Sequence, residues 1–215
     1  MKELEKELFR KKIPKLLEAL KQRQYDPYFF ETAPEASEFV LGQILPEETV
    51  GIGGSLTLRE GLGLTRALRA KGIAVTDHWD AEGDPPRRLA LKRKQREANV
   101  FLSSMNAVTL DGIMVNLDGG GNRVAGTCSG SNRVIVVAGV NKVVESLDLA
   151  IHRTRNHAAV LNAIRLKRET PCAETGVCSD CATPQRICAA LLILYKRPTD
   201  IERFTVVLVN EELGY

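Results

Sequence analysis

The sequence predicts an α/β fold, in which strands and helices alternate around a buried sheet. Residues 49–52 have strand character and are followed directly by a glycine-rich turn and a helical pattern. Residues 134–138 are wholly apolar, which is typical of a strand that is buried on both faces. The composition agrees with a folded globular domain, because 44% of the 215 residues are hydrophobic and 27% are charged.

Charge and hydropathy argue against two kinds of partner. The formal net charge is only +3 and the basic residues are scattered among nearly as many acids, so we expect no nucleic acid partner. No apolar run approaches the ~20 residues that span a bilayer, and the first residues lack the apolar segment of a signal peptide. We therefore expect a cytoplasmic protein with no membrane partner.

The N-terminal elements are expected to be scaffold. Residues 1–24 predict a charged amphipathic helix, residues 25–32 a turn-rich connector and residues 34–45 a second amphipathic helix. The first helix should pack on the body of the protein or on a partner subunit, and the second arrangement would make the protein a homodimer. We divide the chain into an N-terminal helical arm, 1–33, and one α/β domain, 34–215.

The turn after residues 49–52 is the first candidate binding site. Thr57 and Glu60 have the spacing of a capping box, which predicts a helix from about Leu58 to Gly72. Free N–H groups and the helix dipole at such a turn favour a phosphate or a carboxylate. The alternative is that the glycines only permit a tight turn. The candidate ligand-binding residues here are Gly53, Gly54, Ser55 and Thr57.

A histidine follows the next predicted strand, residues 73–76. His78 would lie at the edge of the sheet where open α/β folds bind their ligands, so it is a candidate catalytic acid, base or metal ligand. It has no partner at a meaningful spacing, which leaves a structural role as the alternative. Residues 87–97 predict a basic helix with a solvated face, and residues 100–103 predict a strand.

Residues 106–125, NAVTLDGIMVNLDGGGNRVA, combine tight turns with many polar side chains. Residues 108–111 and 113–117 have strand character and are bounded by turns of Asp, Asn and Gly. The polar density exceeds what turns alone require, and the triple glycine would let a ligand approach the backbone. The candidate ligand-binding residues are Asp118, Gly120 and Asn122; Asp118 is also a candidate catalytic residue, and Arg123 could meet an anionic group.

Four of the five cysteines fall in one C-x5-C-x2-C-x6-C array. In a reducing compartment such clusters bind metal or perform redox chemistry more often than they form disulfides. Zinc ribbons use two C-x2-C pairs and this array has one, whereas irregular spacing within one segment is commoner in iron–sulfur sites. We therefore favour a [4Fe-4S] cluster over zinc, and over disulfides or free thiols. The predicted ligands are Cys172, Cys178, Cys181 and Cys188, within the loop 171–188.

The number of ligating cysteines decides the chemistry. With four ligands the cluster is coordinatively full and transfers electrons or stabilises structure; with three, one iron stays open as a Lewis acid. Cys128 is a remote ligand, a catalytic thiol or, as we favour, a small buried side chain. Arg186 could donate to cluster sulfur, and a helix over 141–167 ends in basic residues that would offset the cluster charge. Residues 189–195 predict an apolar helix, and residues 204–209 a strand that closes the sheet.

The chain carries the segments GIGGSLTLRE, NAVTLDGIMVNLDGGGNRVA and VIVVAGVNKVV. In this order and spacing they resemble the LUD-domain family, which is named for lactate utilisation. The likeness covers roughly residues 34–167 and continues to the C-terminal strand, and the cysteine-bearing tail resembles that of some short members in anaerobes. The resemblance implies a three-layer α/β/α sandwich of the type shared by sugar-phosphate isomerases and coenzyme A transferases. It also implies a ligand cleft at the glycine-rich turn.

The resemblance implies a function as well. Family members are associated with oxidation of lactate to pyruvate alongside iron–sulfur partner proteins. We expect a LUD-type iron–sulfur protein in anaerobic oxidation of lactate or a related 2-hydroxy acid, with a small anionic metabolite as ligand and a redox partner protein. GIGGSL does not match G-x-G-x-x-G, so the sequence shows no nicotinamide signature. Two alternatives stay open: a small-anion-binding regulatory or structural module with a metal staple, and a non-redox enzyme that uses an open iron.

Overall fold

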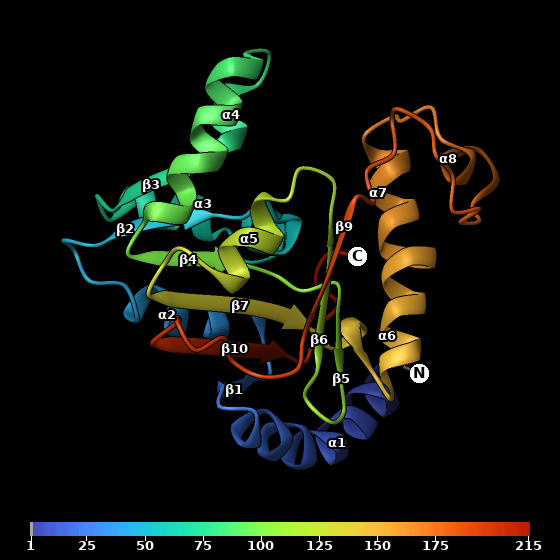
Figure 1. Ribbon diagram of the computed structural model, residues 1–215. Coiled ribbons are helices and arrows are strands. Elements are labelled where there is room, and N and C mark those ends of the chain that lie inside the picture. Colours follow the sequence, from blue (N-terminus) through green and yellow to red (C-terminus); the bar gives the residue numbers. More distant parts are fainter. Residues whose placement is uncertain (1) are drawn as a thin grey trace.

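A parallel six-stranded sheet forms the centre of the molecule (Figure 1). The structure is a computed structural model that describes residues 2–215. Every neighbouring pair of strands in this sheet is parallel, in the order β1-β10-β7-β4-β2-β3. The strands are β1 (Asp26–Phe30), β2 (Thr49–Ile52), β3 (Ala74–Asp77), β4 (Val100–Ser103), β7 (Arg133–Gly139) and β10 (Arg203–Val209).

A second sheet of four strands stands beside the first, in the order β8-β5-β6-β9 (Figure 1). Its central pair, β5 and β6, is an antiparallel hairpin, as the sequence predicted for this segment. β9 then adds to β6 in the antiparallel sense, and β8 adds to β5 in the parallel sense. The strands are β5 (Ala107–Thr109), β6 (Met114–Asp118), β8 (Val143–Val144) and β9 (Ala190–Leu194).

Helices surround the two sheets. The α-helices are α1 (Lys2–Gln22), α2 (Ala33–Gly42), α3 (Leu64–Ala70), α4 (Pro85–Lys94), α5 (Asn122–Cys128), α6 (Leu147–Arg153), α7 (Ala159–Arg165) and α8 (Pro171–Thr175). The shorter helical turns are η1 (Thr57–Gly61), η2 (His78–Ala81), η3 (Gln95–Glu97), η4 (Val140–Lys142) and η5 (Thr154–Ala158). α6, η5 and α7 follow one another without a break and form the long helix beside the second sheet in Figure 1. None of the helices in residues 2–215 combines the length and the apolar character that crossing a bilayer requires.

The central strands direct alternate side chains to opposite faces of the large sheet. Val100 and Leu102 pack with residues of α2 and α3, whereas Phe101 between them packs with α1 and the second sheet. Full burial of such a side chain contributes roughly 1.5–3 kcal/mol, so the two clusters hold the layers together. The predicted three-layer α/β/α architecture is therefore confirmed, with the small sheet inserted on one side.

Two predictions of secondary structure are wrong. Residues 26–30, expected in a turn-rich connector, form β1, an edge strand of the large sheet, where Pro27 is tolerated. Residues 190–194, expected in an apolar helix, form β9, whose backbone pairs with β6. An apolar run of this length fits either structure, and the unpaired edge of β6 decides between them.

The helix starts also differ from the prediction. Thr57 does not form a capping box; the Ser55 hydroxyl accepts a hydrogen bond from the Leu58 N–H (3.4 Å) at the start of a short π-turn. A regular helix begins only at Leu64, after Gly63 at φ 63°. The helix expected from residue 141 likewise begins at Leu147, where Ser146 is the N-cap.

Candidate functional site

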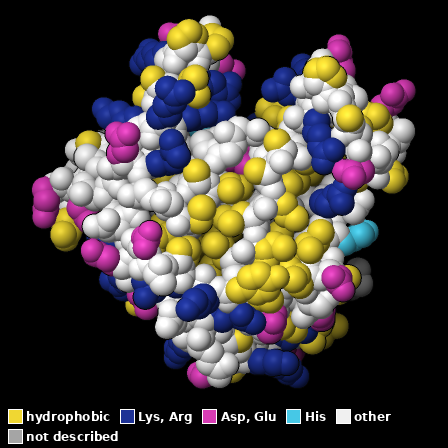
Figure 2. Space-filling model, in the orientation of Figure 1, with side chains coloured by type: hydrophobic (Ala, Val, Ile, Leu, Met, Phe, Trp, Pro, Cys, Tyr) yellow, Lys and Arg dark blue, Asp and Glu magenta, His cyan; other side chains and the backbone are white. Residues whose placement is uncertain are grey.

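The carboxyl edge of the large sheet opens into a cavity of about 810 Å³. Four adjacent strands of the sheet, β7, β4, β2 and β3, end at this edge, which is where open α/β sheets bind ligands. α4 supplies one side wall, and the end of α7 with the following segment supplies the other. Figure 2 shows the opening as a notch between these two projections, with Lys and Arg side chains on both sides.

The structure brings the two glycine-rich segments of the sequence together at this cavity. One follows β2 and the other follows β6, and they are separated by more than one strand and helix along the chain. His78, at the end of β3, lies at the same place. The candidate residues that line the cavity are Gly53, Gly54, Ser55, Thr57, His78, Asp118, Gly120 and Asn122.

Close packing accounts for the two glycines after β2. A Cβ atom on Gly53 would lie 2.9 Å from the Phe101 ring and 3.0 Å from the Ser103 hydroxyl. Gly54 has φ 69°, and a Cβ there would lie 2.6 Å from Cε1 of His78. Both positions therefore require glycine for packing reasons, whatever the cavity binds.

His78 is buried against this turn, and its surroundings favour the neutral imidazole. Its Nδ1 lies 3.1 Å from Oε1 of Gln95, and because an amide oxygen only accepts, Nδ1 carries the proton. Burial lowers the pKa of His78, and the charge of Lys92 lowers it further. Nε2 is thus left as a free proton acceptor beside the cavity.

Asp118 uses both carboxylate oxygens to shape the second glycine-rich turn. Oδ1 accepts from the Gly120 N–H (3.2 Å), and Oδ2 accepts from the Arg123 N–H (2.7 Å) at the start of α5. Its backbone oxygen also accepts from the Ala189 N–H (3.1 Å), which attaches the turn to the end of the cysteine-bearing segment. This geometry favours an architectural role for Asp118 over a catalytic one.

Cations outnumber acids among the residues that line the cavity. Only Glu82 and Asp118 carry acidic side chains there, so the cavity has a positive potential that suits an anion. These basic side chains come from many separate elements, so no local sequence pattern indicates them. The basic residues that line the cavity are Arg59, Arg88, Lys92, Arg123, Lys142, Arg165, Arg168 and Arg186.

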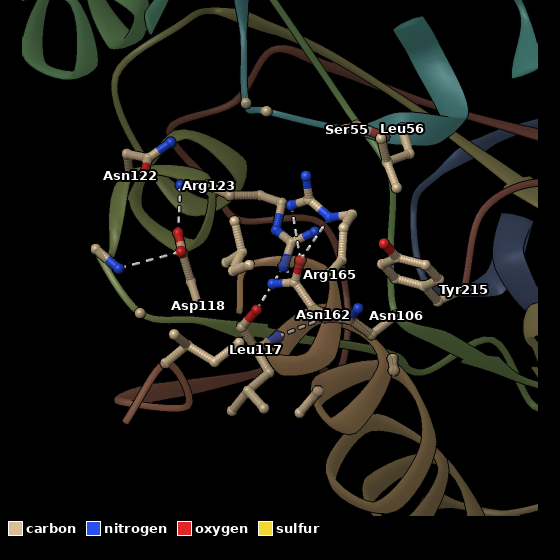
Figure 3. A pocket seen from close by; sticks show the side chains of 18 of the residues that line it. Ser55, Leu56, Asn106, Leu117, Asp118, Asn122, Arg123, Asn162, Arg165 and Tyr215 are labelled. Carbon is tan, nitrogen blue, oxygen red and sulfur yellow. Dashed lines mark hydrogen bonds between the residues drawn. The ribbon is translucent and has the colours of Figure 1, made fainter. Parts of the chain in front are cut away.

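Arg123 has an unused hydrogen-bond donor. One terminal nitrogen donates to the Leu117 carbonyl (2.5 Å), whereas its buried Nε has no partner among the described residues. Figure 3 shows Arg123 and Arg165 at the centre of the cavity, with Asp118 on one side and Tyr215 on the other. A guanidinium with a free buried donor is a ready partner for a carboxylate or phosphate oxygen.

Lys142, which the sequence did not single out, is buried in the cavity wall with a relative exposure of 3%. Its Nζ donates to the hydroxyl oxygens of Thr57 and Ser104, both at 2.9 Å, and no carboxylate in residues 2–215 forms an ion pair with it. Burial lowers the pKa of Lys142 to about 7, and the charges of Arg123 and Arg153 act in the same direction.

The only tryptophan of the chain also lines the cavity. The Arg59 guanidinium lies 4.5 Å from the centre of the Trp79 ring, and the Arg165 guanidinium lies 5.8 Å from it. Arg59 is fixed in turn by an ion pair with the buried carboxylate of Asp77 (2.5 Å). The indole thus lies beside cations from two different walls of the cavity.

The cysteine-bearing segment borders the same cavity. Residues 184–187, between the last two cysteines of the array, line it. The Arg186 guanidinium lies beside the Cys188 side chain, which raises the pKa of Arg186; it also donates to the backbone oxygens of Cys181 (2.6 Å) and Cys188 (3.0 Å) and pairs with Asp180. The position of the array beside the glycine-rich turn agrees with the cleft expected there.

The four array cysteines have the thiol groups that bind metals, but these thiols are not placed together around one position. All are unpaired thiols with partial exposure, and hydrogen bonds to Thr183 lower the pKa of Cys181, which favours the thiolate that binds metal. However, within residues 2–215 no three side chains of the His, Cys, Asp or Glu type are placed to share an ion. A cluster therefore requires the segment to rearrange around it. Cys128 lies on α5, where burial raises the pKa of its thiol.

Comparison with known proteins places the chain among relatives. A family model described as LUD domain matches residues 13–209. The curated proteins contain no match. Among solved structures, the chain is similar to the crystal structure of a DUF162 family protein from Deinococcus radiodurans, with a TM-score of 0.52 and 10% identity over 93% of this chain and 97% of that chain. At this identity the likeness concerns the fold alone.

Proposed function

The chain belongs to the LUD domain family, which is associated with lactate utilisation, and from this premise we propose a function for its cavity. The cavity binds the carboxylate of lactate or a related 2-hydroxy acid during anaerobic oxidation. The array of Cys172, Cys178, Cys181 and Cys188 holds a [4Fe-4S] cluster beside it. The cluster passes electrons to a redox partner protein.

One observation carries this proposal: the cysteine-bearing segment and the cationic wall border the same cavity. Residues 184–187 line the cavity together with Arg123 and Arg165. The free Nε of Arg123 and the low number of acids favour a carboxylate in this space. An anion and a thiolate-bound cluster would therefore be neighbours.

Different residues of the cavity bind the substrate and accept its proton. Arg123 and Arg165 bind and orient the carboxylate. His78, neutral and with a free Nε2, accepts the proton of the substrate hydroxyl. When bound, the cluster supplies one-electron transfer, so a partner protein or a second cofactor must take the other electron.

Anaerobic purification of the full chain tests the cluster. We expect a brown protein with a broad absorption near ~400 nm that dithionite bleaches, about four irons per chain and an electron paramagnetic resonance signal after reduction. Serine variants of the four array cysteines should each lose most of the iron, whereas Cys128→Ser should keep it. A colourless protein with one zinc per chain would contradict the cluster, and full iron in all array variants would show that its ligands lie elsewhere.

Calorimetric titration with lactate and longer 2-hydroxy acids tests the cavity. Because about 810 Å³ exceeds what lactate needs, the longer acids are included. We expect Arg165→Met and Arg123→Met to weaken binding at least about tenfold, which corresponds to about 1.4 kcal/mol. Arg66→Met, on the exposed face of α3, should bind as the unaltered protein does. Equal affinity in all variants would show that the carboxylate does not bind to these two side chains.

The four thiols are not placed to share one ion, and this observation favours a second candidate function. In one form of it, the protein binds a small anion and a metal only stabilises the fold. In the other, a cluster with three cysteine ligands keeps one iron open to polarise the substrate, without redox chemistry. Retention of anion binding after removal of the metal would favour the binding module. Loss of iron in three cysteine variants but not in the fourth would favour the open iron.

A further inference from the structure

Lys142 has the surroundings of a reactive amine rather than those of an ion-pair partner. It is the last residue of η4, three residues beyond β7, and so lies at the same sheet edge as the two glycine-rich turns. Its side chain is buried, yet it lines the cavity. A lysine that serves only the fold would normally be paired with a carboxylate at such a depth.

The hydrogen bonds of Lys142 leave one position of its nitrogen free. Thr57 donates its own hydroxyl proton to the Leu213 carbonyl (3.1 Å), and Ser104 donates to the Met105 carbonyl (3.4 Å). Both hydroxyl oxygens can therefore only accept from Lys142. A neutral amine satisfies both with its two protons, and the third tetrahedral position of the nitrogen then holds the lone pair.

Burial and the neighbouring charges favour the neutral form of Lys142. Arg123 on α5 and Arg153 on α6 are the cations that act on it, and no acid counters them in the described chain. The hydroxyls of Thr57 and Ser104, which accept from Lys142, are uncharged. A desolvated lysine beside other cations is a recognised arrangement for a nucleophilic amine.

We propose that Lys142 forms an imine with the carbonyl group of a small 2-oxo acid bound in the cavity. This inference rests on the proposed function only for the class of ligand, because oxidation of a 2-hydroxy acid yields a 2-oxo acid; it does not require the cluster. The Arg123 guanidinium next to Lys142 would hold the carboxylate of the same molecule.

The step needs no oxidant or reductant. Nζ of Lys142 attacks the carbonyl carbon and forms a C–N bond, and the carbonyl oxygen leaves as water with the two protons that the amine held. The product is a C=N bond between Lys142 and the acid. The imine nitrogen then takes up one proton from solvent, and the resulting cation withdraws electrons from the neighbouring carbons, which is the means by which such lysines activate oxo acids.

Reductive trapping with pyruvate tests the imine on the full chain. The protein is incubated with pyruvate and cyanoborohydride, digested and mapped by mass spectrometry, with lactate as the matched ligand that lacks a carbonyl. We expect one carboxyethyl group on Lys142, saturating with pyruvate concentration, and none with lactate. Lys142→Met should lose the adduct and Lys94→Met, an exposed lysine of α4, should keep it. Mapping of the unaltered protein locates the adduct even if Lys142→Met folds poorly.

The outcomes separate this inference from the proposed function. Pyruvate binding in a calorimeter without an adduct on Lys142 overturns the imine and leaves the cavity assignment standing. An adduct in protein that never holds iron supports the imine and contradicts the proposed cluster. Equal labelling of Lys142, Lys92 and the exposed lysines overturns the imine, because it shows no special reactivity. Absence of both binding and adduct overturns both proposals.

Discussion

The cavity wall and the cysteine-bearing segment are neighbours, but the fold determines them to different degrees. The wall consists of residues at strand ends, such as Ser104 and Lys142, which are buried and hydrogen-bonded. The segment from Gly176 to Cys188 contains no helix or strand, and its cysteines are partly exposed. A wall of this kind is ready for a ligand in the folded protein, whereas metal ligands on an irregular segment take their positions as the metal binds.

The largest expected effect is the pH dependence of stability that comes from the buried Lys142 in the cavity wall. Between about pH 7 and the ordinary lysine value of 10.5, the unfolded chain holds a proton on Lys142 that the folded chain lacks. The free energy of unfolding should therefore rise with pH over this range, by about 1.4 kcal/mol per unit and on the order of 5 kcal/mol in all. Urea denaturation at several pH values should show this slope reduced in Lys142→Met.

The control for this measurement is Lys94→Met, which removes a lysine from the exposed side of α4. Groups other than Lys142 titrate alike in both variants, so the difference between them isolates one side chain. If Lys142→Met keeps the slope of the unaltered protein, Lys142 is charged at neutral pH and its burial does not lower its pKa.

The next effect compares a glycine of the large sheet that supports the cavity wall with a glycine of the cysteine-bearing segment. A Cβ on Gly51 of β2 would lie 1.8 Å from the Gln95 carbonyl oxygen, and both atoms belong to the backbone. Gly51→Ala should therefore destabilise the protein by about 3 kcal/mol or more. Gly176, at φ 76°, has open space around it, so Gly176→Ala should cost only the ~1–2 kcal/mol of a left-handed residue. Equal losses in denaturant unfolding would contradict the difference in packing between the large sheet and the cysteine-bearing segment.

The smallest effect concerns the ion pairs that hold the cysteine-bearing segment. Asp180 pairs with Arg155 (2.8 Å) and with Arg186 (3.0 Å), and its side chain is 65% exposed. Exposed pairs of this kind are screened by salt and add little stability. Asp180→Asn should melt at the same temperature as the unaltered protein in calorimetry at physiological salt. A clear drop would show that these pairs order the segment.

The sequence predicted most strands of the large sheet but missed β1 and misread β9. Residues 49–52, 100–103 and 134–138 were found because buried parallel strands are short apolar runs bounded by turns. β1 was missed because its Asp-Pro start is typical of a turn, and β9 was misread because a short apolar run has no distinct period. In these two cases the partner strand, β10 for β1 and β6 for β9, decides the structure, and only the tertiary fold supplies that partner.

The candidate site shows the same division. The glycine-rich turns could be predicted because tight turns leave a local signature, and the structure brings both to one cavity. Lys142 could not be found in this way, since it stands in an ordinary GVNK sequence and owes its burial to residues from three other parts of the chain. Whether the cavity residues bind the proposed acid stays a prediction.

The tryptophan between two arginines gives the protein an optical reporter of its own. Trp79 is the sole indole, so its emission comes from one place, beside Arg59 from the sheet edge and Arg165 from the end of α7. An anion that draws either guanidinium away changes the field on the ring, and a shift of α7 as the following segment rearranges does the same. Fluorescence of the unlabelled chain therefore reports both the arrival of an anion and the ordering of the cysteine-bearing segment.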